Sequence, residues 1–134
     1  MSPVKHLDHL NLSVTDLDET VRWYGAVFGF HVVERGTSKG VPFAILRAGD
    51  ALLCAYEHPE RDQPRGGPRH HLNHFALRLT DQADFLRRAA SEGLTWRWSS
   101  PVEWPHSTAW YALDPSGYEI EIVFWKDDTV RFAA

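Results

Sequence analysis

The chain has 134 residues, of which 43% are hydrophobic, so it can form one compact domain with a sizeable core. Its formal net charge is -4, and its lysines and arginines are scattered rather than gathered into the basic stripe that nucleic-acid binding requires. No stretch approaches the roughly 18 uninterrupted apolar residues of a membrane helix, and residues 1–9 lack the pattern of a secretion signal. The single cysteine, Cys54, excludes a disulfide within the chain and fits a reducing compartment. We therefore expect a cytoplasmic protein that binds neither nucleic acid nor membrane.

The first element is a strand that returns later in the chain. Residues 9–16 read HLNLSVTD and residues 74–81 read HFALRLTD, with four identical positions. In both copies apolar residues alternate with a second set of residues, which predicts a strand whose apolar face lies against a helix. The histidine that opens each copy, His9 or His74, then belongs to the opposite face.

A helix is expected after each of these strands. Asp16 can cap the first helix, with Glu19 three residues on to close a capping box, and Asp81 takes the cap position of the second. Apolar residues at helical spacing follow both caps. Each helical pattern ends near a glycine, Gly29 or Gly93.

Short strand-like runs follow each helix. In the first half they lie at roughly 30–35, 41–48 and 51–57, and in the second half at roughly 95–99, 107–113 and 118–125. This order predicts an α+β fold, with a βαβββ module that occurs twice and forms curved mixed sheets.

The domain organisation follows from the same pattern. We predict a single domain over residues 1–134, with one module at about 5–57 and the other at about 70–125. Residues 58–69 are rich in proline, glycine and charge and are interpreted as the linker between modules. Residues 126–134 are interpreted as a loosely held tail.

The two equivalent histidines indicate a metal site. Two modules related by a pseudo-twofold axis bring equivalent residues near each other, so His9 and His74 are expected to face a common point. Neutral imidazole is a ligand for iron, zinc, nickel and copper. In the last strand, Glu119 and Glu121 share a face opposite an apolar one. A carboxylate near the centre of a sheet is costly unless a positive charge such as a metal ion compensates it.

Three segments carry a resemblance to a known family. HLNLSVTDLDETVRWY, HLNHFALRLTD and YALDPSGYEIEI together resemble the glyoxalase/bleomycin resistance/dioxygenase superfamily, also called vicinal oxygen chelate proteins, over about residues 5–125. The resemblance implies that the two modules form a metal-binding cleft. It implies the metal ligands His9, His74 and Glu121. It also implies a small-molecule substrate and a homodimer.

The resemblance leaves three functions open. The preferred prediction is an extradiol-type ring-cleaving dioxygenase that uses Fe(II) and O2 on a small catecholic substrate. Tyr111, ten residues before Glu121, would then hydrogen-bond an oxygen at the metal, and His58 or His106 would act as the acid–base residue. The second function is a Lewis-acid enzyme using Mn, Zn or Ni, either a glyoxalase-like isomerase or a fosfomycin-resistance-type thiol transferase. The third is a metal-free antibiotic-binding resistance protein.

Overall fold

The structure is a computed structural model that describes residues 1–60 and 72–132. The chain forms two compact units, Met1–Arg61 and Asp62–Ala134. Most of the predicted linker 58–69 and the predicted start of the second module at residue 70 lie outside the described residues. The predicted single domain with its module boundaries therefore stays a prediction. None of the helices in the described ranges is long and apolar enough to cross a membrane.

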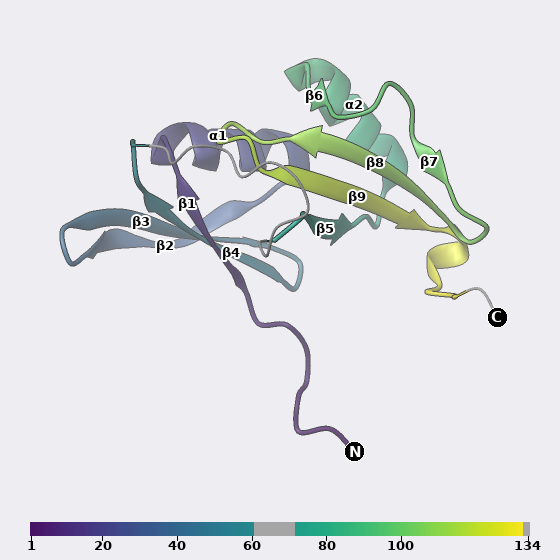
Figure 1. Cartoon of the computed structure of the whole chain (residues 1–134), viewed down its shortest axis with the longest axis horizontal. Coiled ribbons are helices and arrows are strands. Elements are labelled where there is room, and N and C mark those ends of the chain that lie inside the picture. The colour runs from purple at the N-terminus through teal and green to yellow at the C-terminus, as the bar shows by residue number, and fades with distance from the viewer. Residues whose placement is uncertain (61–71, 133–134) are drawn as a thin grey trace. The chain divides into compact units, whose positions relative to one another are not determined.

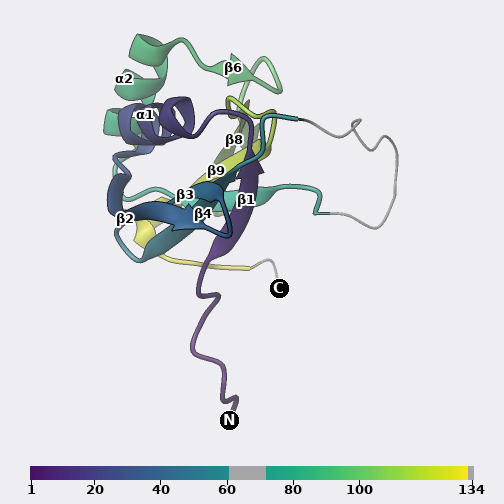
Figure 2. The ribbon, with the colours of Figure 1, turned by 90° about the vertical axis from the view of Figure 1, so that its left-hand side faces the viewer.

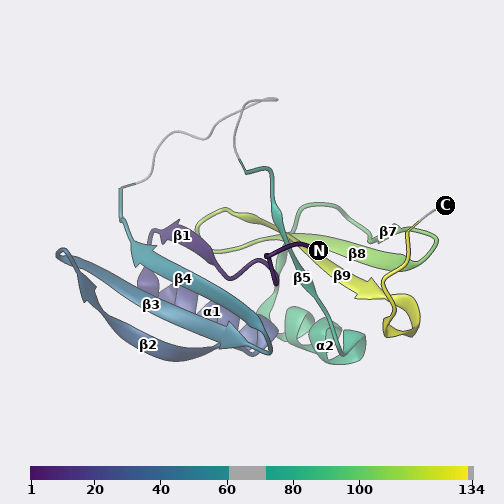
Figure 3. The same cartoon turned by 90° about the horizontal axis from the view of Figure 1, so that it is seen from below.

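The first unit is a four-stranded sheet with one helix on one of its faces (Figure 3). Its strand order is β1-β4-β3-β2, in which β1 runs parallel to β4 and the other neighbours are antiparallel. Residues 1–9 precede the first strand as an irregular segment (Figure 2). The elements in chain order are β1 (Leu10–Val14), α1 (Leu17–Phe28), β2 (His31–Ser38), β3 (Val41–Ala48) and β4 (Ala51–Glu57).

The predicted alternation of β1 decides which face of this sheet is buried. Leu12 and Val14 are 3% and 1% exposed, whereas Asn11 and Ser13, which alternate with them, are exposed. The core on the α1 side also contains, from the helix and the neighbouring strands, Leu17, Trp23, Tyr24, Val27, Ala44, Leu46, Leu53 and Ala55. The opposite face, which continues from His9, is therefore the one open to polar chemistry.

The second unit repeats this arrangement with a different outer edge. Its sheet has the order β5-β9-β8-β6, β7 pairs with β8, and β5 runs parallel to β9 as β1 does to β4 (Figure 1). The mixed sheets and the two helices confirm the predicted α+β class. The elements are β5 (Phe75–Arg78), α2 (Gln82–Glu92), β6 (Thr95–Trp96), β7 (Val102–Glu103), β8 (Ser107–Leu113), β9 (Glu119–Trp125) and the short 3-10 helix η1 (Lys126–Asp128).

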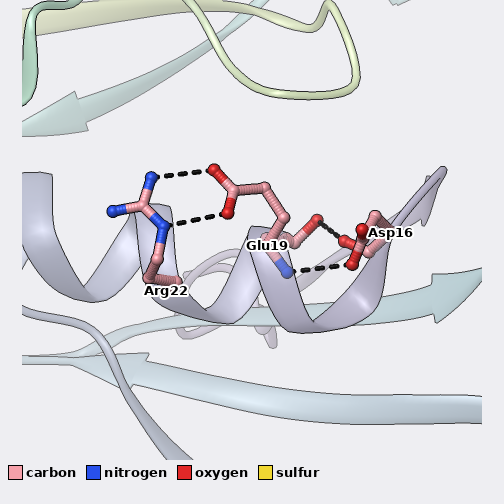
Figure 4. A network of polar contacts seen from close by, with 4 residues as sticks. Asp16, Glu19 and Arg22 are labelled. Carbon is pink, nitrogen blue, oxygen red and sulfur yellow. Dashed lines mark hydrogen bonds and ion pairs between the residues drawn. The ribbon is translucent and has the colours of Figure 1, made fainter.

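Both helices begin at the predicted caps. The Glu19 N–H donates to the Asp16 carboxylate over 3.0 Å, and the Asp84 N–H donates to the Asp81 carboxylate over 2.9 Å. The capping box is not completed, because the Glu19 carboxylate accepts two hydrogen bonds from Arg22 instead (Figure 4). A two-point guanidinium–carboxylate pair is stronger than a bond to a neutral N–H.

Two segments differ from the prediction for local reasons. The strand expected at 95–99 ends at Trp96; the Arg97 N–H still donates to the Tyr111 carbonyl, and the chain then leaves the ladder. Residues 99–101, Ser-Ser-Pro, have low strand propensity, and proline has no N–H for a ladder. In the predicted tail, η1 is tied to β5, since Arg78 pairs with Asp128 at 2.8 Å.

Candidate metal centre

The face of the second sheet opposite α2 gathers polar side chains. On β9, Ile120 and Ile122 are fully buried on the α2 side, so Glu119 and Glu121 lie on the other face. The antiparallel register of β8 and β9 sets Tyr111 directly opposite Glu121. His74 immediately precedes β5, the strand on the other side of β9. These alternations place a histidine, a tyrosine and two glutamates on one surface of a single unit.

Within this surface the side chains contact one another. The Tyr111 hydroxyl donates a hydrogen bond to the Glu121 carboxylate. The His74 ring lies edge-on to Tyr111, with the ring centroids 5.8 Å apart. His74 Nδ1 lies 2.7 Å from Asn73 Oδ1 and 3.8 Å from the Glu119 carboxylate. The structure therefore brings together three residues predicted for the site: His74, Tyr111 and Glu121.

The environment of Tyr111 keeps its hydroxyl protonated. Burial, the hydrogen bond to Glu121 and the negative charges of Glu121 and Glu119 raise the pKa of Tyr111 to about 12. Each cause disfavours a phenolate, because a third negative charge would have to enter a partly desolvated cluster. Tyr111 is thus a hydrogen-bond donor across the physiological pH range.

The first unit contributes His9, on the face away from α1. His9 Nδ1 lies 2.8 Å from the Asp8 carboxylate, and the side chain is 44% exposed. On the same face, Cys54 is paired with Asn11 across β1 and β4 and is half-buried. Burial and the carboxylates of Asp8 and Glu34 raise the pKa of the Cys54 thiol. Cys54 is not among the predicted ligands.

The predicted ligands suit a divalent cation by their chemistry. Two imidazoles and one carboxylate are a common set for iron, manganese or zinc, and each imidazole has an oxygen against Nδ1, as ligating histidines commonly do. Within either unit taken by itself, the described residues contain no group of three His, Cys, Asp or Glu side chains placed to hold a metal. The predicted set takes His9 from the first unit and both His74 and Glu121 from the second. The set stays a prediction.

The two predicted acid–base histidines occupy different places. His58 directly follows β4, is exposed, and donates its backbone N–H to the Val14 carbonyl. His106 precedes β8, five residues from Tyr111, which corresponds to roughly 17 Å along a strand. The structure therefore does not bring His106 to the cluster of Tyr111 and Glu121.

Three residues around the histidines were not singled out from the sequence: Asp8, Asn73 and Arg97. Asp8 and Asn73 precede His9 and His74 at equivalent positions of the repeat, so extending the repeat by one residue would have drawn attention to them. Arg97, which pairs with Glu119 at 3.2 Å, gives no such signal, because its partner lies 22 residues away on another strand. Glu119 was predicted to share a strand face with Glu121, but its partners His74 and Arg97 were not predicted.

A family model described as the Glyoxalase/Bleomycin resistance protein/Dioxygenase superfamily matches residues 6–122. A comparison with curated proteins found no match.

Several solved structures share the fold. A glyoxylase/bleomycin resistance protein/dioxygenase domain from Frankia sp. EAN1pec has a TM-score of 0.78 at 21% identity, covering 94% of this chain and 96% of that one. A variant of the fosfomycin resistance protein FosX from Listeria monocytogenes, in complex with Mn(II) and 1S,2S-dihydroxypropylphosphonic acid, has a TM-score of 0.73 at 17% identity, covering 92% and 94%. FosX from Mesorhizobium loti has a TM-score of 0.68 at 22% identity, covering 89% and 90%.

Proposed function

Because the chain belongs to the glyoxalase/bleomycin resistance protein/dioxygenase superfamily, we propose that it is a metal-dependent enzyme whose divalent cation is held by His9, His74 and Glu121. The observation that carries the proposal is the grouping of His74, Tyr111 and Glu121 on one face of the second sheet. Three protein ligands leave coordination positions open for a substrate.

The proposed reaction class is Lewis-acid catalysis on a small molecule. The cation, when bound, withdraws electron density from a substrate oxygen. Glu121 supplies the negative charge that favours the cation, and Tyr111 restricts the orientation of that carboxylate. The Tyr111 hydroxyl has one proton, which it donates to Glu121, so donation to a substrate oxygen beside the cation would require that proton to turn away from the carboxylate.

The solved relatives suggest which metal and substrate to test first. The Listeria FosX structure contains Mn(II) and a phosphonic acid with hydroxyls on adjacent carbons. We propose Mn(II) as the first metal, and as substrate a small molecule with oxygens placed to reach it. Fe(II), Zn and Ni remain candidates, as does a glyoxalase-like isomerisation.

The second candidate is the extradiol-type dioxygenase with Fe(II). It is favoured by the stretch YALDPSGYEIE and by the position of Tyr111 beside Glu121. The comparisons do not support ring cleavage specifically. The candidate also needs an acid–base residue, for which His58 is proposed before His106, since His106 lies far along β8 from Tyr111.

Both candidate functions require a divalent cation on the same three ligands, so metal binding tests what they have in common. The full chain is stripped of metal, and Mn(II), Fe(II), Zn(II) and Ni(II) binding is measured by calorimetry, anaerobically for iron. We expect metal binding to weaken at least 100-fold in each of the variants His9→Ala, His74→Ala and Glu121→Gln, because each variant removes one of only three protein ligands. His6→Ala is the matched control, since His6 is exposed and its Nδ1 lies 2.8 Å from the carbonyl oxygen of the adjacent Leu7. Equal affinity in all four variants would disprove the ligand set.

Turnover distinguishes the reactions. The metal-loaded chain is incubated with fosfomycin with and without a thiol, with hemithioacetals, and with catechols under O2. Loss of fosfomycin or isomerisation of a hemithioacetal supports Lewis-acid chemistry. A yellow ring-cleavage product with oxygen uptake supports the dioxygenase. If the protein binds an antibiotic tightly without metal, and His9→Ala leaves that affinity unchanged, the result supports the metal-free resistance protein.

We also propose that the protein is a cytoplasmic homodimer, by its resemblance to this superfamily. Sedimentation equilibrium of the full chain tests the dimer, and a molar mass of one chain at micromolar concentration would exclude it.

A further inference from the structure

Both proposed ligand histidines are held in the same way. Asp8 Oδ2 lies 2.8 Å from His9 Nδ1, and Asn73 Oδ1 lies 2.7 Å from His74 Nδ1. Asp8 and Asn73 stand immediately before the two histidines, at equivalent places in the repeat. The same contact thus occurs once in each unit.

The chemistry of the two partners decides which ring nitrogen carries the proton. A carboxylate oxygen and an amide oxygen accept hydrogen bonds and do not donate them. A neutral imidazole in such a contact must therefore carry its proton on Nδ1 and keep the lone pair on Nε2. Nε2 is then the atom that each ring presents to a cation.

In the second unit the residue before the histidine, Asn73, is neutral, and a carboxylate near His74 comes from Glu119 instead. Glu119 lies 3.8 Å from His74 Nδ1, and its side chain is only 21% exposed. Arg97 holds the other Glu119 oxygen at 3.2 Å, and the Arg97 guanidinium lies 4.7 Å from the ring centre of Trp98. Each histidine therefore has one carboxylate on its Nδ1 side: Asp8 for His9, and Glu119 for His74.

We propose that Asp8 and Asn73 are positioning residues that fix the Nδ1–H form of His9 and His74, and that Glu119 supplies to His74 the negative charge that Asp8 supplies to His9. The consequence of this arrangement for a metal rests on the proposed function. Outer partners of ligating histidines typically contribute about 10- to 100-fold to metal affinity. Since Asp8 and Asn73 are exposed, we expect about tenfold for each.

The first test uses the metal-free protein and is independent of any activity. Long-range proton–nitrogen NMR of the full chain reports which nitrogen of each imidazole is protonated at a pH where the rings are neutral. We expect the Nδ1–H form for both His9 and His74. Asp8→Ala and Asn73→Ala should each shift the ring beside the change toward the Nε2–H form that free imidazole side chains favour. Asp8→Asn and Asn73→Asp should retain the Nδ1–H form, because each keeps an accepting oxygen.

The second test measures affinity for Mn(II) by calorimetry. Asp8→Ala, Asn73→Ala and Glu119→Gln should weaken binding about tenfold each. Asp8→Asn should lose less than Asp8→Ala. Glu103→Gln is the control for Glu119→Gln, since Glu103 is a carboxylate of the same sheet whose partner is the Thr108 hydroxyl. The spread of amide resonances confirms that each variant is folded.

The outcomes separate this inference from the proposed function. If the two alanine variants keep the parent's ring protonation, the inference is wrong, whatever the metal does. If the parent binds Mn(II) and the alanine variants bind it equally well, the inference is also wrong and the proposed function stands. If the parent binds none of the four metals, the proposed function fails, and the NMR result alone decides whether Asp8 and Asn73 position the rings.

Discussion

At the scale of single residues, strand register determines the chemistry of Tyr111. The pairing of β8 with β9 places its hydroxyl against Glu121, and strand alternation puts Glu119 on the same face. The two carboxylates differ in their partners, because Glu121 accepts from a neutral phenol whereas Glu119 pairs with Arg97. Glu119 thus has its charge compensated by the protein. Among residues 1–60 and 72–132, no basic side chain forms an ion pair with Glu121, which makes it the better ligand for an added cation.

This environment predicts an unusual titration of Tyr111. In the metal-free protein its pKa of about 12 exceeds the ordinary value of 10.0, so stability that depends on the protonated phenol is complete below pH 10 and is lost as the pH rises toward 12. The absorbance of phenolate, followed against pH and corrected with a Tyr111→Phe variant, measures this pKa. Glu121→Gln should lower it, because the variant removes a negative charge. Burial, the largest cause, remains, so the pKa should stay above 10. A Tyr111 that titrates at its ordinary value in the folded parent would contradict the prediction.

At the scale of elements, each helix is defined by its own sequence at both ends. The caps Asp16 and Asp81 start the helices, and Gly29 and Gly93 end them with backbone φ angles of 74° and 69°, a conformation that favours glycine. These signals are local, so the helix bounds could be predicted closely from the sequence. The buried faces of β1, β5 and β9 could also be predicted, because period-two alternation decides which side chains are buried.

The edge of the second sheet could not be predicted in the same way. The short strands β6 and β7 depend on which parts of residues 95–106 reach β8, and this is decided by pairing across the sheet rather than by local pattern. The partners of Glu119 were missed for the same reason, since Arg97 approaches it from that edge.

The cap of α1 leads to a stability prediction. Asp16→Ala should lower the free energy of unfolding by about 1 kcal/mol, because the Glu19 N–H loses its acceptor at the start of a helix that covers the first sheet. Asp16→Asn is the matched control and should be close to the parent, since asparagine caps about equally well. Urea denaturation measures both. A loss in Asp16→Asn as large as in Asp16→Ala would show that the charge, rather than the hydrogen bond, stabilises the helix.

The surface ion pairs of the helices predict a dependence on acid. Hydrogen bonds from Arg22 lower the pKa of Glu19 below 4.5, and those from Arg88 and Arg87 lower the pKa of Asp84 below 3.8. A lowered carboxyl pKa contributes stability that is present above the ordinary value and disappears as the pH falls through the folded-state value. The difference in unfolding free energy between the parent and Arg22→Met should therefore be small at pH 7, because the pair is exposed, and should vanish well below pH 4.5. A difference that persists at that acidity would assign the effect of Arg22 to packing instead.

At the scale of the whole molecule, the repeat explains how much of the site could be predicted. The equivalence of His9 and His74 is visible in the sequence, and in the second unit Tyr111 contacts both His74 and Glu121. The sequence did not decide which histidine is the acid–base residue. His58 and His106 have no equivalent partners in the repeat, and the pairing of β8 sets His106 far from Tyr111. The repeat therefore relates only His9 and His74, the family resemblance adds Tyr111 and Glu121 to the predicted site, and the ligand set stays a prediction.

The division of the proposed ligands between the two units makes metal binding a test of the whole molecule. A cation that binds only the folded chain stabilises it by RT ln(1 + [M]/Kd), which is about 2.7 kcal/mol when the free metal is 100 times Kd. Mn(II) should therefore raise the melting temperature of the parent, and a chelator should return it to the metal-free value. His9→Ala in the first unit and Glu121→Gln in the second should each abolish the rise, because each removes one of three ligands, while His6→Ala should keep it. If either ligand variant melts with the same metal-dependent rise as the parent, that residue does not bind the cation, and the proposed ligand set is wrong.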